Sequence, residues 1–308
     1  MPSRLISNST HVSTIQSLNR SGHIHIINLH YIIRHICHIP PLYLSIYYLS
    51  NHSNMATKPT VKVTPVTSAT DLARFFDVTA SALAAQARDG FFMAMNPGWD
   101  TPEGRAAGAE RLARRFESSS SSTARDRNGN PTTVFLKATV DDPASPNSGK
   151  EVIAGAAIWV QASMVDGYGE KPVTDLAEAM DLNELYPGDE SQHAFLRQVD
   201  ASLHGRRVEV VKEIAGSASP AVFALDLCVV DPAFQRRGIA SQLVRWGLEE
   251  AKRRGGIEAV LEASSMGRHV YGQLGFEQEG GEIVYDVDER FRGRDLPSNV
   301  FMRTGRPQ

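Results

Sequence analysis

The sequence has very little cysteine: its 308 residues include only Cys37 and Cys228. Two cysteines cannot build a disulfide framework, and their positions offer no paired spacing of metal ligands, so we expect no metal site. This cysteine usage is typical of a reducing compartment, and we expect the cytoplasm.

Two further absences exclude whole classes of partner. No apolar run reaches the roughly 18 residues that cross a bilayer, so we expect no membrane association. The formal charge of −3 provides no basic surface, so we expect no nucleic-acid partner. The hydrophobic content of 42% is sufficient for a buried core in a chain of this length.

The first 54 residues lack Asp, Glu and Lys altogether and contain seven of the ten histidines. Transit peptides are poor in acidic residues and contain arginine, so a mitochondrial address is one interpretation. Pro40 and Pro41 interrupt the apolar stretch 36–49, however, and the histidine spacing fits no defined metal site. We interpret residues 1–54 as a disordered or non-native extension, with targeting as the alternative, and residues 55–308 as the domain.

The order of apolar and polar segments in the domain predicts an α/β fold, with a central mixed, twisted sheet of six or seven strands flanked by helices. We expect strands at 61–66, 133–139, 152–161, 221–230, 257–263, 283–287 and 300–303. We expect helices at 71–90 (capped by Thr70 and ended by Gly90), 102–116, 239–254 and 269–274. Residues 162–221, with helices at 175–180 and 191–202, are interpreted as a helical insertion.

The familiar nucleotide-binding loops are missing, since the chain has neither GxxxxGK[ST] nor GxGxxG before a helix. In their place, the predicted strand 221–230 leads through Asp231-Pro232 to Gln-Arg-Arg-Gly-Ile-Ala at 235–240, where a helix begins. The free N–H groups and the dipole of a helix start suit a bound pyrophosphate. Gly238 and Ala240 leave these amides accessible, and Arg236 and Arg237 can each add a charge-assisted bond of about 1.5–3 kcal/mol.

A second motif, His-Val-Tyr-Gly-Gln-Leu-Gly-Phe at 269–276, follows the first after roughly 30 residues. Together the two motifs resemble the GNAT superfamily of N-acetyltransferases, over residues 221–303 well and over 55–220 only loosely. The C-terminal third looks closest to small-molecule acetyltransferases of the puromycin-modifying kind and their fungal relatives. The resemblance implies the GNAT fold, with acetyl-CoA as co-substrate.

The resemblance also implies a role for each matching residue. The backbone of Val229 and Val230 would bind the pantetheine arm and the thioester carbonyl. The loop formed by Gln235, Arg236, Arg237, Gly238, Ile239 and Ala240 would bind the pyrophosphate. Tyr271 would protonate the departing CoA thiolate. Family members often have Asn before the Tyr segment, where this chain has Ser264-Ser265-Met266, so the pantetheine contact there is in doubt.

Acetyl transfer to an amine also needs a base, because an amine with a pKa near 10.4 costs about 4.6 kcal/mol to present uncharged at pH 7. Asp226, inside a predicted buried strand, and Glu262, at the end of the next strand, are alternative candidates. Some family members place a carboxylate one alternation earlier, where this chain has Ala224. We expect His269 on the surface.

Other polar and aromatic residues are expected to be structural. Trp159 and Trp246 are interpreted as packing residues, and Cys228 has no neighbour in the sequence that marks it as a nucleophile. The basic runs 206–207 and 252–254 are interpreted as solvated faces.

The predicted function is direct transfer of acetyl from acetyl-CoA to the primary amine of a small molecule. A protein lysine or N-terminus is an alternative acceptor, and a non-catalytic acyl-CoA sensor is an alternative class. Whether the chain forms a homodimer stays open.

Overall fold

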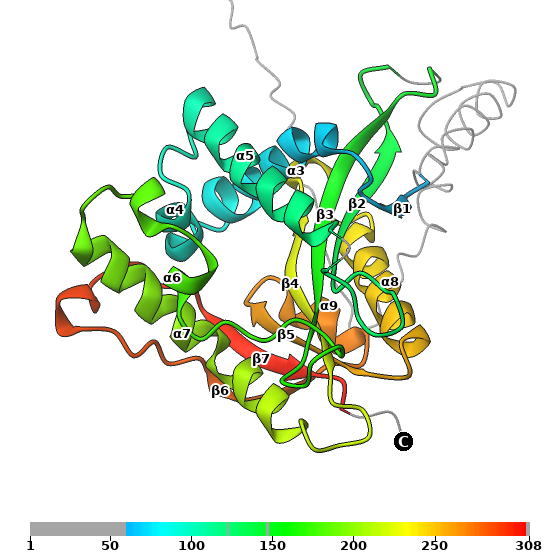
Figure 1. Ribbon diagram of the computed structural model, residues 1–308. Helices are drawn as coiled ribbons and strands as arrows, with labels where there is room; N and C mark the ends of the chain where they lie inside the picture. The colour runs from blue at the N-terminus through cyan, green and yellow to red at the C-terminus, as the bar shows by residue number, and fades with distance from the viewer. Residues whose placement is uncertain (1–59, 122, 146–147, 306–308) are drawn as a thin grey trace, which may run out of the picture. The chain divides into compact units, whose positions relative to one another are not determined.

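The computed structural model describes residues 60–121, 123–145 and 148–305, and a mixed sheet of seven strands runs through them (Figure 1). The strands lie in the order β1-β2-β3-β4-β5-β7-β6, and all neighbours are antiparallel except β4 and β5. The predicted α/β class is confirmed. The predicted extension 1–54 lies outside the described residues. The strands are β1 (Lys62–Pro65), β2 (Thr133–Asp141), β3 (Glu151–Ala162), β4 (Val222–Val230), β5 (Glu258–Ser264), β6 (Glu277–Glu282) and β7 (Asn299–Arg303).

Helices cover both faces of the sheet, with α8 on one face and α3 and α5 on the other (Figure 1). The alternation of β3 explains this: Trp159 packs with Leu243 of α8, whereas Ile158 packs with Phe75 of α3. The α-helices are α3 (Leu72–Thr79), α4 (Gly90–Met95), α5 (Pro102–Ser119), α6 (Leu176–Ala179), α7 (Glu190–Glu213), α8 (Ile239–Arg253) and α9 (Arg268–Gln273).

The predicted helix 71–90 is interrupted. The side chain of Ser68, and not Thr70, caps the 3-10 turn that precedes α3. A π-helix, Ala80–Gln86, follows α3, and the Asp89 carboxylate accepts the Phe92 N–H, so Gly90 begins α4 instead of ending a helix. The prediction therefore missed a cap whose residue type, Asp, is common at helix starts.

One predicted strand is wrong. Residues 283–287 form no strand, and β6 lies earlier, at Glu277–Glu282, where it pairs with β7. The segment Glu277–Glu282 is mostly exposed and contains three Glu and two Gly, so no apolar alternation marks it. Val287 is buried instead in the cluster around α7, which explains the apolar signal that suggested a strand.

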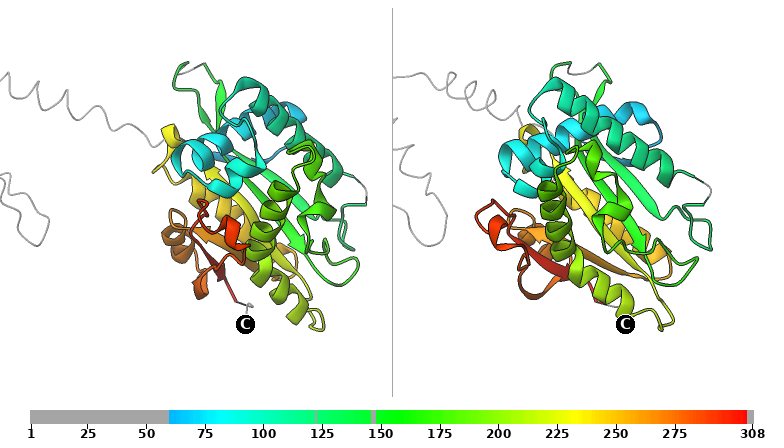
Figure 2. Two further views of the ribbon diagram at one scale, coloured as in Figure 1. Left: turned by 90° about the vertical axis from the view of Figure 1, so that its left-hand side faces the viewer. Right: turned by 60° about the vertical axis from the view of Figure 1, so that its left-hand side comes forward.

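Helix α7 runs across the sheet on the side opposite α8, and in Figure 2 this side is turned toward the viewer. It is much longer than the predicted helix at 191–202. Its sheet-facing side is apolar at both ends, with Leu196 and Val199 in one cluster and Val210 and Val211 in another. Between these clusters lies Arg207, which is only 9% exposed.

Candidate functional site

Strands β4 and β5 separate in the middle of the sheet. They pair only from Val222↔Glu258 to Leu225↔Leu261. Beyond that point β4 continues beside β3, and β5 continues beside β7. A register shift between β3 and β4 also leaves Asp226 without a partner on β3, which bends the strand at the point of separation. The unpaired edge of β4 that follows includes the predicted cofactor-binding residues Val229 and Val230.

The loop after β4 presents an open helix start. Gly238 is the residue before α8 and has a left-handed backbone (φ 80°), which glycine adopts without strain. No side chain caps the first turn of α8, so the amides that begin at Ile239 and Ala240 have no capping partner among the described residues. These amides are available to an anion. The sequence predicted this arrangement.

The loop side chains differ in their surroundings. Gln235 exchanges hydrogen bonds with Gln86 and donates to the Val230 carbonyl at 3.2 Å, which ties the loop to the π-helix. The Arg237 guanidinium lies 5.2 Å from the centre of the Phe234 ring. Arg236 is exposed and has a left-handed backbone (φ 63°). Of the two arginines, Arg236 is therefore the one whose charge is not directed back onto the loop.

Asp231 fixes the start of this loop. Its carboxylate accepts the Ala233 N–H at 2.9 Å and pairs with Arg74 of α3 at 2.5 Å. The turn is therefore held to α3, on the other side of the sheet from α8.

Tyr271 of α9 lies beside Cys228 of β4, on the α8 side of the sheet. Burial raises the pKa of the Tyr271 hydroxyl well above its usual value, and a hydrogen bond to the Cys228 thiol raises it further. Burial also raises the pKa of Cys228 to about 12. At neutral pH the phenol thus keeps its proton, as an acid must, and the thiol is not a nucleophile. Exposed His269 is on the surface, as predicted.

The other side of the separation holds a buried ion cluster, which we call the Arg207 clamp. Arg207 donates to Asp226 at 2.9 Å and to both oxygens of Glu262, and Arg115 of α5 adds a bond of 2.7 Å to Asp226. The prediction that residues 206–207 form a solvated face is therefore wrong for Arg207. The structure brings both predicted base candidates together on one guanidinium.

This pairing changes what the two carboxylates can do. Burial would raise the pKa of Asp226, but the charges of Arg115 and Arg207 outweigh burial and lower it well below its ordinary value. Glu262 has a side chain only 6% exposed, and both its oxygens accept bonds from Arg207. Asp226, with its lowered pKa, is therefore a poor proton acceptor at neutral pH, and the oxygens of Glu262 are already occupied by Arg207.

Sequence inspection missed a neighbouring pair on α7. His204 Nδ1 lies 3.0 Å from Asp200 Oδ1, one helical turn away. The spacing Asp-x-x-x-His-x-x-Arg, from Asp200 to Arg207, is the sequence signal, because residues three and four apart share one face of a helix.

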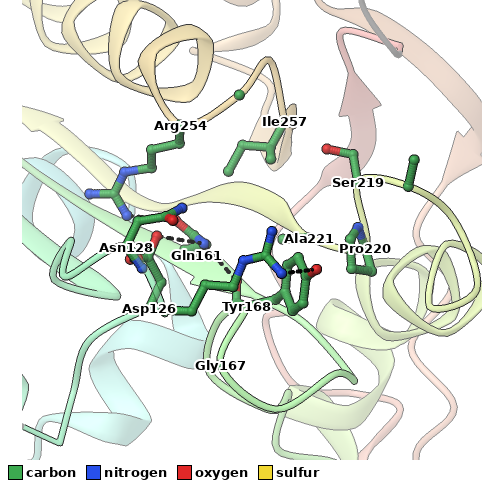
Figure 3. Close-up of a pocket in the computed structure, with 13 residues that line it drawn as sticks. Asp126, Asn128, Gln161, Gly167, Tyr168, Ser219, Pro220, Ala221, Arg254 and Ile257 are labelled. Atoms are coloured by element: carbon green, nitrogen blue, oxygen red, sulfur yellow. Dashed lines mark hydrogen bonds between the residues drawn. The ribbon is translucent and has the colours of Figure 1, made fainter.

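A cavity of about 230 Å³ lies elsewhere, at the start of β4 and the end of α8 (Figure 3). It is lined by Asp126, Gln161 and Arg254, among others. The Arg254 side chain is 2% exposed and bonds to Gln161 Oε1 at 2.7 Å and Glu250 Oε1 at 2.7 Å. The prediction of a solvated face at 252–254 is thus also wrong for Arg254, which also donates to the Pro131 carbonyl at 2.9 Å and so ties loop 124–131 to α8. Because the cavity faces the opposite end of β4 from the Gly238 loop, we do not assign the candidate site to it.

The predicted packing roles of the tryptophans are confirmed. Trp159 is fully buried and stacks on Phe223 with ring centres 5.0 Å apart, and Trp246 packs against the same cluster. Within residues 60–121, 123–145 and 148–305, no group of His, Cys, Asp and Glu is arranged to hold a metal ion. No helix in these segments combines the length and apolar content of a membrane span.

Residues 168–276 match the family model described as the acetyltransferase (GNAT) family. No curated protein matches the sequence. Residues 168–276 are therefore a GNAT acetyltransferase domain, of the family that uses acetyl-CoA, and the resemblance based on the two motifs is confirmed.

Several solved structures are similar to this chain. A polyamine N-acetyltransferase from Drosophila melanogaster has 13% identity and a TM-score of 0.48, over 79% of this chain and 98% of that one. Arylalkylamine N-acetyltransferase 2 from Aedes aegypti has 18% identity and a TM-score of 0.47, over the same shares. The PaiA N-acetyltransferase from Thermoplasma acidophilum, in complex with coenzyme A, has 13% identity and a TM-score of 0.39, also over 79% and 98%.

Proposed function

We propose that this acetyltransferase transfers the acetyl group of acetyl-CoA directly to the primary amine of a small molecule. The observation that carries the proposal is the uncapped start of α8 at Gly238, on the same side of the sheet as the partly buried Tyr271. Nothing in the direct reaction requires a covalent enzyme intermediate, and the high pKa of Cys228, about 12, is consistent with this.

The residues present fit acetyl-CoA as substrate. The amides that begin at Ile239 and Ala240 would bind the pyrophosphate, with Arg236 supplying charge and Arg237 and Gln235 shaping the loop. The backbone of Val229 and Val230 would bind the pantetheine arm along the unpaired edge of β4. Bound there, acetyl-CoA supplies the activated acetyl group, and the Tyr271 hydroxyl would give its proton to the departing sulfur.

The acceptor would approach from the α7 side, where this helix lies across the separated strands β4 and β5. Arg207, on this helix, is only 9% exposed. We expect α7 to close this side, whereas a peptide acceptor needs an open groove. Such closure would favour a small amine over a protein lysine or N-terminus.

One assay series tests the proposal on the full chain. CoA release is measured with tyramine, spermidine, glucosamine, free lysine and a lysine-containing peptide as acceptors, and CoA binding is measured by calorimetry. We expect turnover with a small amine and a loss of kcat of about 10²–10⁴-fold in Tyr271→Phe, with CoA affinity retained, because a general acid contributes about that much. Tyr168→Phe, at the remote cavity, is the matched control. CoA binding with no turnover on any acceptor would indicate a sensor, and turnover confined to the peptide would overturn the small-molecule assignment.

A second arm tests the phosphate loop. Arg236→Ala should weaken CoA binding about 10-fold or more, the loss of one charge-assisted bond, whereas Arg237→Ala should have a smaller effect because its guanidinium lies over Phe234. Calorimetry at low and high salt checks both, since an ionic contact weakens with salt. Equal affinities for Arg236→Ala and the unmodified chain would remove Arg236 from the site.

A further inference from the structure

The polar stretch in the middle of α7 is not fully explained by the Arg207 clamp. The sheet-facing side of the helix is apolar at Leu196 and Val199 and again at Val210 and Val211. Between them lie Asp200 and His204 as well as Arg207. Arg207 has its partners in Asp226 and Glu262, whereas Asp200 and His204 pair only with each other within the described residues. Partly buried titratable groups of this kind need a partner or a task.

The geometry of the pair defines the proton positions. His204 Nδ1 faces Asp200 Oδ1 at 3.0 Å, so the carboxylate favours the ring proton at Nδ1 and leaves Nε2 to accept one. The His204 side chain is 26% exposed and that of Asp200 is 15% exposed. The imidazole is therefore partly sheltered and keeps some contact with solvent.

The charges around His204 come from four elements. Asp200 and Arg207 lie on α7 itself, Glu262 on β5 and Asp226 on β4, and Arg115 of α5 is bound to Asp226. Burial would lower the pKa of His204, but pairing with Asp200, helped by Glu262, outweighs burial and the charge of Arg207 and raises that pKa above 6.5. His204 consequently keeps its charge to a higher pH than a free imidazole does, whereas Asp226 stays ionised to a lower pH than a free carboxylate.

We infer that His204 is the general base of the acetyl transfer and that Asp200 is its positioning residue. The inference rests on the proposed function and names the residue that the acceptor amine meets. His204 Nε2 takes a proton from the substrate ammonium, directly or through one water. The neutral nitrogen then forms the C–N bond to the acetyl carbon as the C–S bond breaks. The sulfur leaves with a proton from Tyr271, whose phenol regains one from the nitrogen, and His204 returns its proton to solvent.

Asp226 and Glu262 then have a different task, which is to hold Arg207. Both of the Glu262 oxygens and one Asp226 oxygen accept bonds from this guanidinium, and the second Asp226 oxygen accepts from Arg115. The two carboxylates that the sequence marked as base candidates are thus occupied. In the described part of the chain, His204 is paired through Nδ1 with Asp200, and its Nε2 has no hydrogen-bond partner.

The test compares pH profiles of kcat/KM for the full chain, with the fastest of the five acceptors named above, in His204→Gln and Asp200→Asn. We expect the unmodified enzyme to lose activity as pH falls through the raised pKa of His204. His204→Gln should remove this acidic limb and lower kcat/KM at pH 7 by about 10²–10⁴-fold. Asp200→Asn should move the limb to lower pH, because it removes the main group that raises the pKa.

The matched control is His193→Gln, on the same helix, whose Nε2 contacts the Tyr186 carbonyl at 2.7 Å. It should leave the acidic limb in place. Added imidazole should restore part of the turnover of His204→Ala, as expected for a missing base. An unchanged pH profile in a folded His204→Gln enzyme would overturn the assignment while leaving the acetyltransferase function intact; absence of turnover in the unmodified enzyme would overturn the function itself. If His204→Gln does not fold, NMR titration of the unmodified chain decides, since a His204 pKa below 6.5 contradicts the proposal.

Discussion

The two faces of the sheet differ in the interactions that fix the helices to β3 and β4. On the α8 face, the helix lies so close that two glycines have no space for a side chain: a Cβ at Gly155 of β3 would meet Ile239, and one at Gly247 of α8 would overlap the Trp159 indole. On the α7 face, the Arg207 clamp joins the helix to β4 and β5 by charge. The α8 face is thus fixed by close apolar contact, whereas the α7 face adds paired ions to its apolar contacts where β4 and β5 separate.

The difference follows from what each face has to hold. Close apolar packing depends on contact area and places the start of α8, with its open amides, rigidly at the end of β4. A buried ion pair adds little net stability but penalises any arrangement that leaves a charge alone. The clamp therefore spans the place where β4 and β5 have no hydrogen bonds to each other, and it specifies how far apart the two strands lie.

The largest effect should come from breaking the charged face. Arg207→Leu leaves Glu262, whose side chain is 6% exposed, without its guanidinium, and Asp226 with Arg115 alone. We expect the free energy of unfolding to fall by about 3–5 kcal/mol, the typical cost of an uncompensated buried charge. Urea denaturation followed by circular dichroism measures it. Arg206→Leu, one residue earlier with a side chain 31% exposed, should cost about 1 kcal/mol or less.

The pH dependence of the same variant identifies the cause. In the unmodified chain the folded-state pKa of Asp226 is lowered, so its stabilising contribution is present above about pH 4 and is lost as pH falls toward that lowered value. In Arg207→Leu, a buried carboxylate left without its partner takes up a proton more readily. The free energy of unfolding of this variant should therefore rise as the pH is lowered from 7 to 5. A loss that did not change with pH would point to packing instead of charge.

The contrast between the faces also explains what could be predicted from the sequence. The α8 face could be predicted because three local patterns mark it. These are the apolar run of β4, the loop ending at Gly238 and the apolar stripe of α8. The Arg207 clamp could not be predicted, because in a sequence a buried arginine looks the same as a surface arginine. Its partners, Asp226 and Glu262, lie on β4 and β5, far from Arg207 in the sequence. His204 was missed because the spacing from Asp200 to Arg207 shows only that these residues share one face of a helix. The position of that face over the separated strands is not encoded in any local pattern.

The apolar face should respond to added volume. Gly247→Ala places a methyl group against Trp159, which is fully buried and stacked on Phe223, so it cannot move aside without disturbing the core. We expect a loss of about 1–3 kcal/mol, the usual cost of overpacking, largely independent of pH and salt. Urea denaturation at pH 5 and pH 7 checks this. If Gly247→Ala instead stabilised the protein, as helix propensity alone would predict, α8 could not lie as close to Trp159 as the structure places it.

The smallest effect should have the opposite sign. Gly205 lies within α7, between His204 and Arg206, and a Cβ there would meet nothing within 4 Å. Gly205→Ala should therefore raise the free energy of unfolding by about 0.5–1 kcal/mol, because alanine loses less conformational freedom in a helix and gains no clash. The same substitution thus tests both faces: it is costly where the helix is held by shape and favourable on the open side of the helix that is held by charge. Differential scanning calorimetry of the two alanine variants would measure the contrast, and a destabilised Gly205→Ala would mean that α7 packs closely on this side too.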